Sequence, residues 1–199
     1  MDAKELCYRS GQWINLGRPG SLERREYTVY SPPGSGFIEV LIREVEGGTV
    51  SRDLRCCRPG DALEVDGPHG SFCIDAAAAA REKFLFVGTG TGVSPFHCFA
   101  LSYPNLSYTL LHGARAAEEL YDSHVYDHGG FVACMSRGPA EARAARVYPG
   151  RVTSWLRENP VEPTRLCYLC GNSDMIYESY AILRSHGVPP SRIFAEVYF

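Results

Sequence analysis

The sequence predicts two domains: a small antiparallel β-barrel, followed by an α/β domain with a doubly wound, five-stranded parallel sheet of strand order 3-2-1-4-5. Three observations support this prediction. Short β-prone runs, separated by glycine- and proline-rich turns, fill residues 1–75. From residue 81 onward, β-prone and helix-prone segments alternate. An apolar run, Phe84–Val87, leads through a glycine-rich turn to a helix start at Pro95.

The composition is that of an ordinary globular protein. The chain has 199 residues, of which 45% are hydrophobic and 22% charged, and its formal net charge is −3. This charge does not suit non-specific binding to nucleic acid. No run approaches the ~20 apolar residues of a membrane span. Residues Met1–Leu6 lack the apolar core of a signal peptide, so we expect a cytoplasmic protein.

The first half, residues 1–80, is predicted to form the barrel domain. Its expected strands are Gln12–Leu16, Glu26–Tyr30, Phe37–Arg43, Ala62–Val65 and Ser71–Ile74. Turn signals such as Pro32-Pro33-Gly34 separate these strands. The alanine run Ala76–Ala80 is expected to be a short helix or a linker.

The second half, residues 81–199, is predicted to form the α/β domain. Its expected strands are Lys83–Val87, Ser107–His112, Phe131–Met135, Leu166–Cys170 and Ile193–Tyr198. Its expected helices are Pro95–Ser102, Ala116–Tyr126, Arg151–Asn159 and Asp174–His186. In the order 3-2-1-4-5, the first and fourth strands are neighbours where the winding reverses. Ligands bind beyond the carboxyl ends of such strands.

A glycine-rich turn follows the first of these parallel strands. Glycines let a backbone approach a diphosphate closely, and the free N–H groups of a helix start favour anions. We expect Ser94 to cap the helix and Pro95 to occupy its first turn. The spacing departs from the usual dinucleotide fingerprint, and a purely steric turn is the alternative. The expected phosphate-binding residues are Gly88, Thr89, Gly90, Thr91 and Gly92.

Further candidates follow the other parallel strands. Gly171 and Asn172 begin a second glycine turn, for which a capped helix start at Asp174 is a compatible alternative. Arg115 follows the second strand, Ser136 and Arg137 follow the third, and Arg146 comes later in the same connection. The forked donors of arginine suit a phosphate monoester. A solvated loop is the alternative for the arginines of residues 137–151, and in particular for Arg143 and Arg146.

The eight cysteines are expected to be reduced thiols, because the chain shows no secretion signal. Cys167 and Cys170 are a close pair, but they lie on a predicted strand. Residues three apart on a strand point to opposite faces. No metal site is therefore predicted.

These motifs resemble those of the ferredoxin–NADP reductase superfamily, and they occur in the same order. The segments that carry the resemblance are Arg25–Thr28 (flavin motif), Gly47–Ser51 (flavin-phosphate loop), Gly67–Phe72 (barrel-closing segment), Gly88–Phe96 (nicotinamide diphosphate loop), Cys170–Ile176 (nicotinamide motif) and Ala195–Phe199 (acidic and aromatic C-terminus).

The resemblance implies an FAD-dependent NAD(P)H oxidoreductase that transfers hydride between NADPH and FAD. The residues implied to hold FAD are Arg25, Tyr27, Thr28, Gly48, Val50, Ser51, Tyr198 and Phe199. Those implied to hold NADPH are Gly88, Thr89, Gly90, Thr91, Gly92, Arg115, Ser136, Arg137, Arg146, Gly171, Asn172 and Met175, with Ser136 and Arg137 at the 2′-phosphate. The implied catalytic residues are Thr28, Cys170 and Glu196.

The sequence contains no C-x4-C-x2-C iron–sulfur spacing, so the electron carrier is expected to be a separate ferredoxin or flavodoxin. Two alternatives stay open: the reductase component of an oxygenase system, and a non-catalytic nucleotide-binding or regulatory subunit. The family barrel begins with a further strand or hairpin, whereas only nine residues precede Ser10. A reduced barrel, or one completed by another chain, is expected, and an unpaired edge favours a homo-oligomer.

Overall fold

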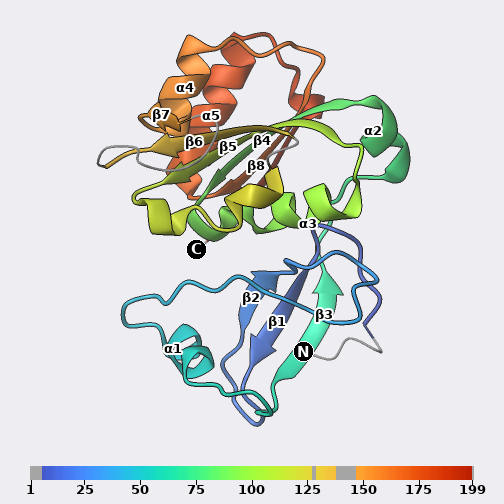
Figure 1. The fold of residues 1–199 in the computed structure, drawn as a ribbon, viewed down its shortest axis with the longest axis vertical. Coiled ribbons are helices and arrows are strands. Elements are labelled where there is room, and N and C mark those ends of the chain that lie inside the picture. Colours follow the sequence, from blue (N-terminus) through green and yellow to red (C-terminus); the bar gives the residue numbers. More distant parts are fainter. Residues whose placement is uncertain (1–5, 127–128, 138–146, 199) are drawn as a thin grey trace.

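The computed structural model describes residues 6–126, 129–137 and 147–198, which form two stacked units (Figure 1). The N-terminal unit contains β1 (Trp13–Gly17), β2 (Arg25–Thr28), α1 (Thr49–Arg55) and β3 (Glu64–His69). The strands of the C-terminal unit are β4 (Lys83–Thr89), β5 (Ser107–Ala114), β6 (Gly130–Met135), β7 (Val147–Pro149), β8 (Leu166–Gly171) and β9 (Ile193–Val197). Its α-helices are α2 (Ala76–Arg81), α3 (Ser94–Ser102), α4 (Val152–Glu158) and α5 (Ser173–Ser185). In the described part of the chain, no helix is long and apolar enough to cross a bilayer.

The N-terminal unit is a small antiparallel sheet of order β2-β1-β3 and is the shortened form of the predicted β-barrel. Two of the expected strands are not formed. Phe37–Arg43 pairs through a single bridge, Val29 with Val40, and the Glu39 N–H donates to the Ser31 hydroxyl at 3.0 Å. Residues 71–74 turn back on themselves, since the Cys73 N–H donates to the Ser71 carbonyl at 2.8 Å. The described residues therefore leave the sheet unclosed.

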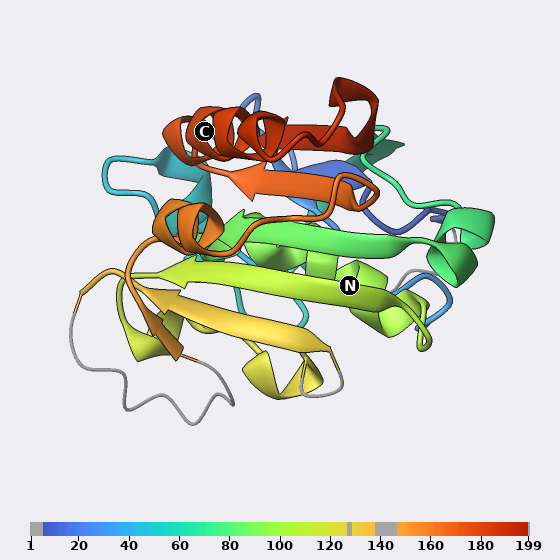
Figure 2. The ribbon, with the colours of Figure 1, turned by 90° about the horizontal axis from the view of Figure 1, so that it is seen from above.

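The C-terminal unit is a six-stranded parallel sheet of order β7-β6-β5-β4-β8-β9. Figure 2 shows these strands running side by side. The five predicted strands occur in the predicted order 3-2-1-4-5. The sixth strand, β7, extends one edge, where Ala133 is opposite Val147. It has only three residues, too few for a periodic signal in the sequence.

Two local predictions are wrong. Residues 116–126 form two 3₁₀ turns, η2 (Ala117–Glu119) and η3 (Ser123–Tyr126), in place of one helix. Asp122 lies between them with φ at +45°, a left-handed conformation that a continuous right-handed helix excludes. Ser94 does not cap α3 but is its first residue, and its hydroxyl donates to the Thr91 carbonyl at 2.7 Å. The 3₁₀ turn η1 (Gly90–Val93) leads directly into this helix.

The parallel sheet is buried on both faces, and each face has its own apolar cluster. Residues from α4 and α5 pack on one face, and residues from α2 and α3 pack on the other (Figure 1). β8 divides the close cysteine pair between the two clusters, with Cys167 on the α5 side and Cys170 on the α3 side. The cysteines therefore point to opposite faces, as their spacing predicted.

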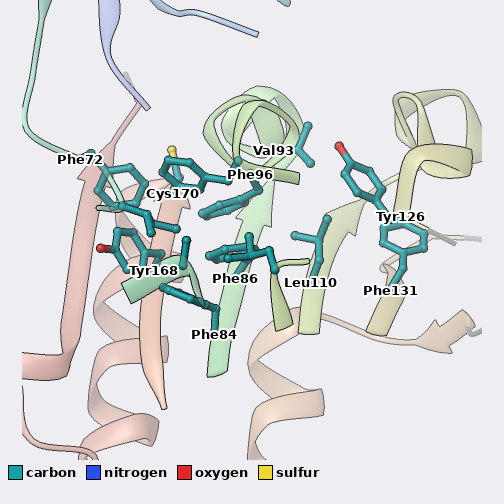
Figure 3. Packing of buried hydrophobic residues seen from close by; sticks show 14 of the residues in the cluster. Phe72, Phe84, Phe86, Val93, Phe96, Leu110, Tyr126, Phe131, Tyr168 and Cys170 are labelled. Carbon is teal, nitrogen blue, oxygen red and sulfur yellow. The ribbon is translucent and has the colours of Figure 1, made fainter. Parts of the chain in front are cut away.

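The cluster on the α3 side is shared with the N-terminal unit. Figure 3 shows the rings of Phe86 and Phe96 stacked at its centre, with centroids 4.8 Å apart. Phe72 reaches this cluster from the segment after β3 and lies edge-on to Tyr168 at 5.0 Å. Ile74 belongs to the same cluster. The small unit is therefore held against α3 by a common apolar core.

Candidate functional site at the junction of the two units

The register of the parallel sheet gathers the predicted nucleotide residues along one edge. Thr89 is opposite Gly113, Ala114 is opposite Met135, and Gly171 is opposite Val197. The chain leaves β4, β5, β6, β8 and β9 at the same edge, because all of these strands run in one direction. The candidates at this edge are Gly88, Thr89, Gly90, Thr91, Gly92, Arg115, Ser136, Arg137, Gly171, Asn172 and Glu196.

The two glycine turns touch each other. The Asn172 N–H donates to the Thr89 hydroxyl oxygen at 3.3 Å. A Cβ on Gly92 would lie 2.4 Å from the Cys170 carbonyl oxygen, and one on Gly171 would lie 2.5 Å from Thr89 Oγ1. Close packing alone therefore requires glycine at both positions. Gly90 differs, since its φ is +56° and a Cβ there would meet no described residue within 4 Å. The backbone is open on the outer side of this turn.

A buried histidine fixes the η1 turn. His112 is fully buried at the end of β5, and its Nε2–H donates to the Gly90 carbonyl oxygen at 3.1 Å. Burial lowers the pKa of His112 to about 4, against the opposing effect of the Gly90 bond, so the ring is neutral near pH 7. His112 was not among the site residues predicted from the sequence. The sequence signal that could have identified it is a polar residue within an apolar run, Leu110-Leu111-His112.

The predicted phosphate-monoester residues lie further along the edge. The Ser136 N–H donates to the Ala114 carbonyl at 3.1 Å, which ties the ends of β5 and β6 together. The Arg115 N–H donates to Glu119 Oε2 at 2.8 Å. Arg115, Ser136 and Arg137 are all exposed. Arg146 lies outside the described residues.

Asn172 and Met175 have structural roles of their own. The Asn172 side-chain oxygen accepts from the Met175 N–H at 3.2 Å and so caps α5. Met175 is buried in the cluster under α5, and its sulfur accepts from the Ser179 hydroxyl. A direct contact of Met175 with a nucleotide stays a prediction.

The two flavin-motif segments meet in the N-terminal unit. Tyr27 packs against the cluster of Leu16, Val50 and Leu54. The Ser51 hydroxyl oxygen accepts from the Val45 N–H at 3.1 Å and fixes the loop that precedes Gly48 and α1. Arg25 is exposed, and its guanidinium donates to the Arg24 carbonyl at 3.0 Å.

Two adjoining cavities open in this unit, and they share Ile42 and Leu54. The larger, of about 400 Å³, lies between β1, the Ile38–Ile42 segment, α1 and Leu63. The smaller, of about 350 Å³, is lined by Glu44, Ser51 and Arg55 as well. The incomplete sheet therefore leaves unfilled space beside the flavin-phosphate loop.

The junction brings the three predicted catalytic residues together with Tyr198. The Tyr198 hydroxyl donates to Thr28 Oγ1, which joins the end of β2 to the end of the chain. The Tyr198 N–H donates to the Gly171 carbonyl at 2.9 Å, and its hydroxyl also interacts with the Cys170 thiol. Glu196 is directly opposite Cys170 in the β8–β9 register. Phe199 lies outside the described residues.

Burial raises the pKa values of the titratable groups at the junction. Burial raises the pKa of Glu196 to about 7, and the nearby Glu26 carboxylate adds to the shift. Glu196 Oε2 is buried and has no hydrogen-bond partner among the described residues. Burial also raises the pKa values of Cys170 and Tyr198 well above their usual ranges. The site thus presents one carboxyl that titrates near neutral pH between a neutral thiol and a neutral phenol.

Comparisons with known proteins agree with this architecture. A family profile described as an oxidoreductase FAD-binding domain matches residues 1–74. Ferredoxin–NADP reductase B of Sorangium cellulosum is 30% identical over 99% of this chain and 88% of its own length. The propane 2-monooxygenase reductase component of Rhodococcus jostii is 28% identical over 96% of this chain, which spans only 55% of that protein.

Solved structures share the fold. The crystal structure of an Amycolatopsis cytochrome P450 reductase superposes with a TM-score of 0.83 at 26% identity, covering 98% of this chain and 62% of that one. Ferredoxin–NADP⁺ reductase of Plasmodium falciparum has a TM-score of 0.80 at 19% identity, covering 98% of this chain and 85% of that one. The 30% identity to the Sorangium protein, over 99% of this chain, shows that the chain belongs to the ferredoxin–NADP reductase family of FAD-dependent oxidoreductases.

Proposed function

We propose that this protein transfers hydride between NADPH and FAD and exchanges single electrons with a ferredoxin or flavodoxin. The observation that carries the proposal is the contact between the Tyr198 and Thr28 hydroxyls. It joins the flavin motif to Cys170 and Glu196, at the edge where the nucleotide turns gather. We propose that residues 1–80 form the flavin domain and residues 81–199 the nucleotide domain, with α2 (Ala76–Arg81) lying across this boundary and packing on the parallel sheet.

The residues at the junction fit these cofactors. Among the described residues, Glu196 Oε2 has no hydrogen-bond partner and no atom approaches the outer side of Gly90, so a polar ligand would find an acceptor at the first and an open backbone at the second. When bound, FAD would supply two-electron exchange with NADPH and one-electron exchange with the carrier. The protein contributes mainly by positioning the two reacting rings.

Each assigned residue has a defined task in this proposal. Gly90 and its neighbours offer backbone N–H groups to the diphosphate of NADPH. Arg137 offers a forked donor to the 2′-phosphate, which favours NADPH over NADH. Arg25 and Ser51 hold FAD, and the Thr28 hydroxyl orients it. Glu196 holds or releases a proton near neutral pH, whereas Cys170 stays a neutral thiol.

The carrier is the least constrained part of the proposal. Reductase components of propane 2-monooxygenase and toluate 1,2-dioxygenase are among the relatives, so an oxygenase component is the second candidate. We also place the protein in the reducing cytoplasm, because all eight cysteines are free. Self-association through the unpaired sheet edge stays a prediction.

The test begins with purified protein that has been incubated with FAD and passed through a desalting column. We expect a bound flavin absorbance band that bleaches under anaerobic conditions on addition of NADPH. Ferredoxin, flavodoxin and ferricyanide are then supplied as separate oxidants to rank the acceptors. A protein that retains no flavin, or whose flavin is not reduced by either nicotinamide coenzyme, would be a non-catalytic subunit and the proposal would be wrong.

A further inference from the structure

Four side chains form a cluster where the two units meet, which we call the interface clasp: Tyr30, His97, Asp122 and Tyr126. The rings of Tyr30 and His97 are stacked, with centroids 3.7 Å apart and planes 2° from parallel. The Tyr30 hydroxyl donates to Asp122 Oδ2 at 2.9 Å. His97 Nδ1 and the Tyr126 hydroxyl are hydrogen-bonded at 3.2 Å. Tyr30, His97 and Tyr126 are buried.

The clasp joins the two halves of the site by a short path. Tyr30 lies two residues after Thr28, on the continuation of β2. His97 lies in α3, which continues directly from the nucleotide turn η1. The flavin strand and the nucleotide turn are therefore connected through the stacked rings of Tyr30 and His97. Neither of these two residues is assigned to a cofactor.

The geometry of the clasp restrains more than one direction of movement. Parallel stacked rings fix the separation and tilt of the two units at this point. The bond from Tyr30 to Asp122 restrains sliding within the plane of the stack. Asp122 is held in turn by its left-handed backbone, with φ at +45°, and its carbonyl accepts from the Val125 N–H at 2.9 Å. Next to the clasp, the Cys98 thiol donates one hydrogen bond to the Ser31 carbonyl, at 3.1 Å.

We propose that the interface clasp is a positioning device, which sets the distance between the flavin strand and the nucleotide turn and thereby the rate of hydride transfer. This inference rests on the proposed function. Tyr30 and His97 act through Thr28 and the η1 turn, and neither is among the residues assigned to FAD or NADPH. Hydride transfer is sensitive to such a device, since a displacement of 1 Å can cost on the order of 100-fold in rate.

The experiment compares two half-reactions of the FAD-loaded protein by stopped flow. Tyr30→Leu removes both the stack and the hydroxyl. We expect flavin reduction by NADPH to slow by about 10- to 100-fold, with the Kd for NADP⁺ unchanged. Oxidation of the dithionite-reduced flavin by ferricyanide needs no nucleotide, so its rate should match that of the parent protein. Tyr30→Phe keeps the stack and should restore most of the NADPH rate.

Tyr103→Phe is the matched control. The Tyr103 hydroxyl donates to the Ile74 carbonyl at 2.8 Å, so this variant also loses one hydrogen bond between segments of the two halves. Tyr103 follows the far end of α3, away from Thr28. We expect a normal rate of flavin reduction by NADPH, even if the melting temperature falls as far as it does in Tyr30→Phe.

The outcomes separate the two proposals. If the parent is reduced by NADPH and Tyr30→Leu is reduced equally fast, the clasp does not position the site, while the proposed function stands. If the parent retains FAD but is not reduced by a nicotinamide coenzyme, both proposals fail. If Tyr30→Leu loses its FAD, the rate of flavin reduction by NADPH is measured instead in His97→Leu, which removes the other ring of the stack. A normal rate in His97→Leu would overturn the inference, and the same tenfold or greater loss would support it.

Discussion

Arg137 is exposed immediately after β6, next to Ser136, which is tied to the end of β5. We expect Arg137→Ala to weaken NADPH binding by roughly 1.5–3 kcal/mol, the cost of losing a hydrogen bond to a charged group. NADH lacks the 2′-phosphate, so its affinity should hardly change. Titration of both coenzymes provides the measurement.

Arg81→Ala is the control for the Arg137 prediction. It removes the same exposed charge from the end of α2, which precedes β4 and so lies at the opposite end of the strands. We expect both coenzymes to bind it normally. An equal loss of NADPH and NADH affinity in Arg137→Ala would contradict the assignment of a 2′-phosphate site.

Glu196 couples stability to pH. Its usual pKa is 4.5, and burial raises it to about 7 in the folded protein. Below pH 4.5 the carboxyl is protonated in both the folded and the unfolded state, and the stabilisation that its neutral form gives the folded protein is fully present. As the pH rises from 4.5 through 7, the unfolded chain ionises first, so this stabilisation is lost. The ligand-free protein should therefore become less stable relative to Glu196→Gln over this range.

The Glu196 prediction is measured as the difference in melting temperature between the parent and Glu196→Gln at several pH values. Other titrating groups, including His112, are present in both proteins and cancel in this difference. A difference that is independent of pH between about 5 and 8 would mean that the pKa of Glu196 is not raised.

At the scale of elements, the strands and helices of the α/β unit follow directly from the sequence. Phe84–Val87 is apolar at every position, as a strand buried on both faces requires. The failures have local causes. Residues 116–126 have a helical pattern, but Asp122 instead turns toward Tyr30, a residue 92 positions earlier. Phe72 and Ile74 were expected in a barrel strand, but they pack into the core of the other unit.

The candidate site was predictable where it depends on strand ends, and not where it depends on contacts distant in sequence. Parallel strands deliver their ends to one edge, so Gly90, Arg137 and Gly171 were expected together. The bond between His112 and Gly90 joins residues 22 apart, so the apolar run around His112 could mark that residue but could not identify its partner. The clasp is even harder to predict from the sequence, since Tyr30 and His97 lie in different units.

The η1 turn depends on His112, and this dependence gives a prediction for the element. His112→Leu leaves the Gly90 carbonyl without its donor, so we expect the turn to shift and the affinity for NADPH to fall by roughly 1 kcal/mol. NADH should lose the same amount, because both coenzymes carry the diphosphate. His112→Gln keeps a side-chain N–H donor and should recover most of the affinity. Unchanged binding of both coenzymes to His112→Leu would show that the turn holds without the histidine.

At the scale of the whole molecule, the two units differ in how much apolar surface they bury. The α/β unit has a large cluster on each face of its sheet. Among its described residues, the N-terminal unit has two clusters of three buried residues each, beside a cavity of about 400 Å³. A small core with unfilled space contributes little stability. The shared core at Phe72 and the clasp couple the unfolding of the N-terminal unit to that of the α/β unit.

The chain has two tryptophans, one in each unit, and they allow this difference to be measured. Trp13 lies in β1 and Trp155 in α4. In Trp155→Phe the fluorescence reports the N-terminal unit, and in Trp13→Phe it reports the α/β unit. Without FAD, we expect the Trp13 signal to change at a lower urea concentration than the Trp155 signal, since the weaker core opens first. Coincident transitions would instead show that the shared core makes the molecule a single cooperative unit.

Addition of FAD to the same two variants tests which unit binds it. A ligand at 100 times its Kd stabilises the folded form that binds it by about 2.7 kcal/mol. If FAD is held by Arg25, Tyr27 and Ser51, the Trp13 transition should move to higher urea and approach the Trp155 transition. The Trp155 signal should shift less, because α4 lies on the face of the parallel sheet opposite α3 and the small unit. If FAD moved the Trp155 transition alone, it would bind the α/β unit, and the flavin assignments in β2 and before α1 would have to be abandoned.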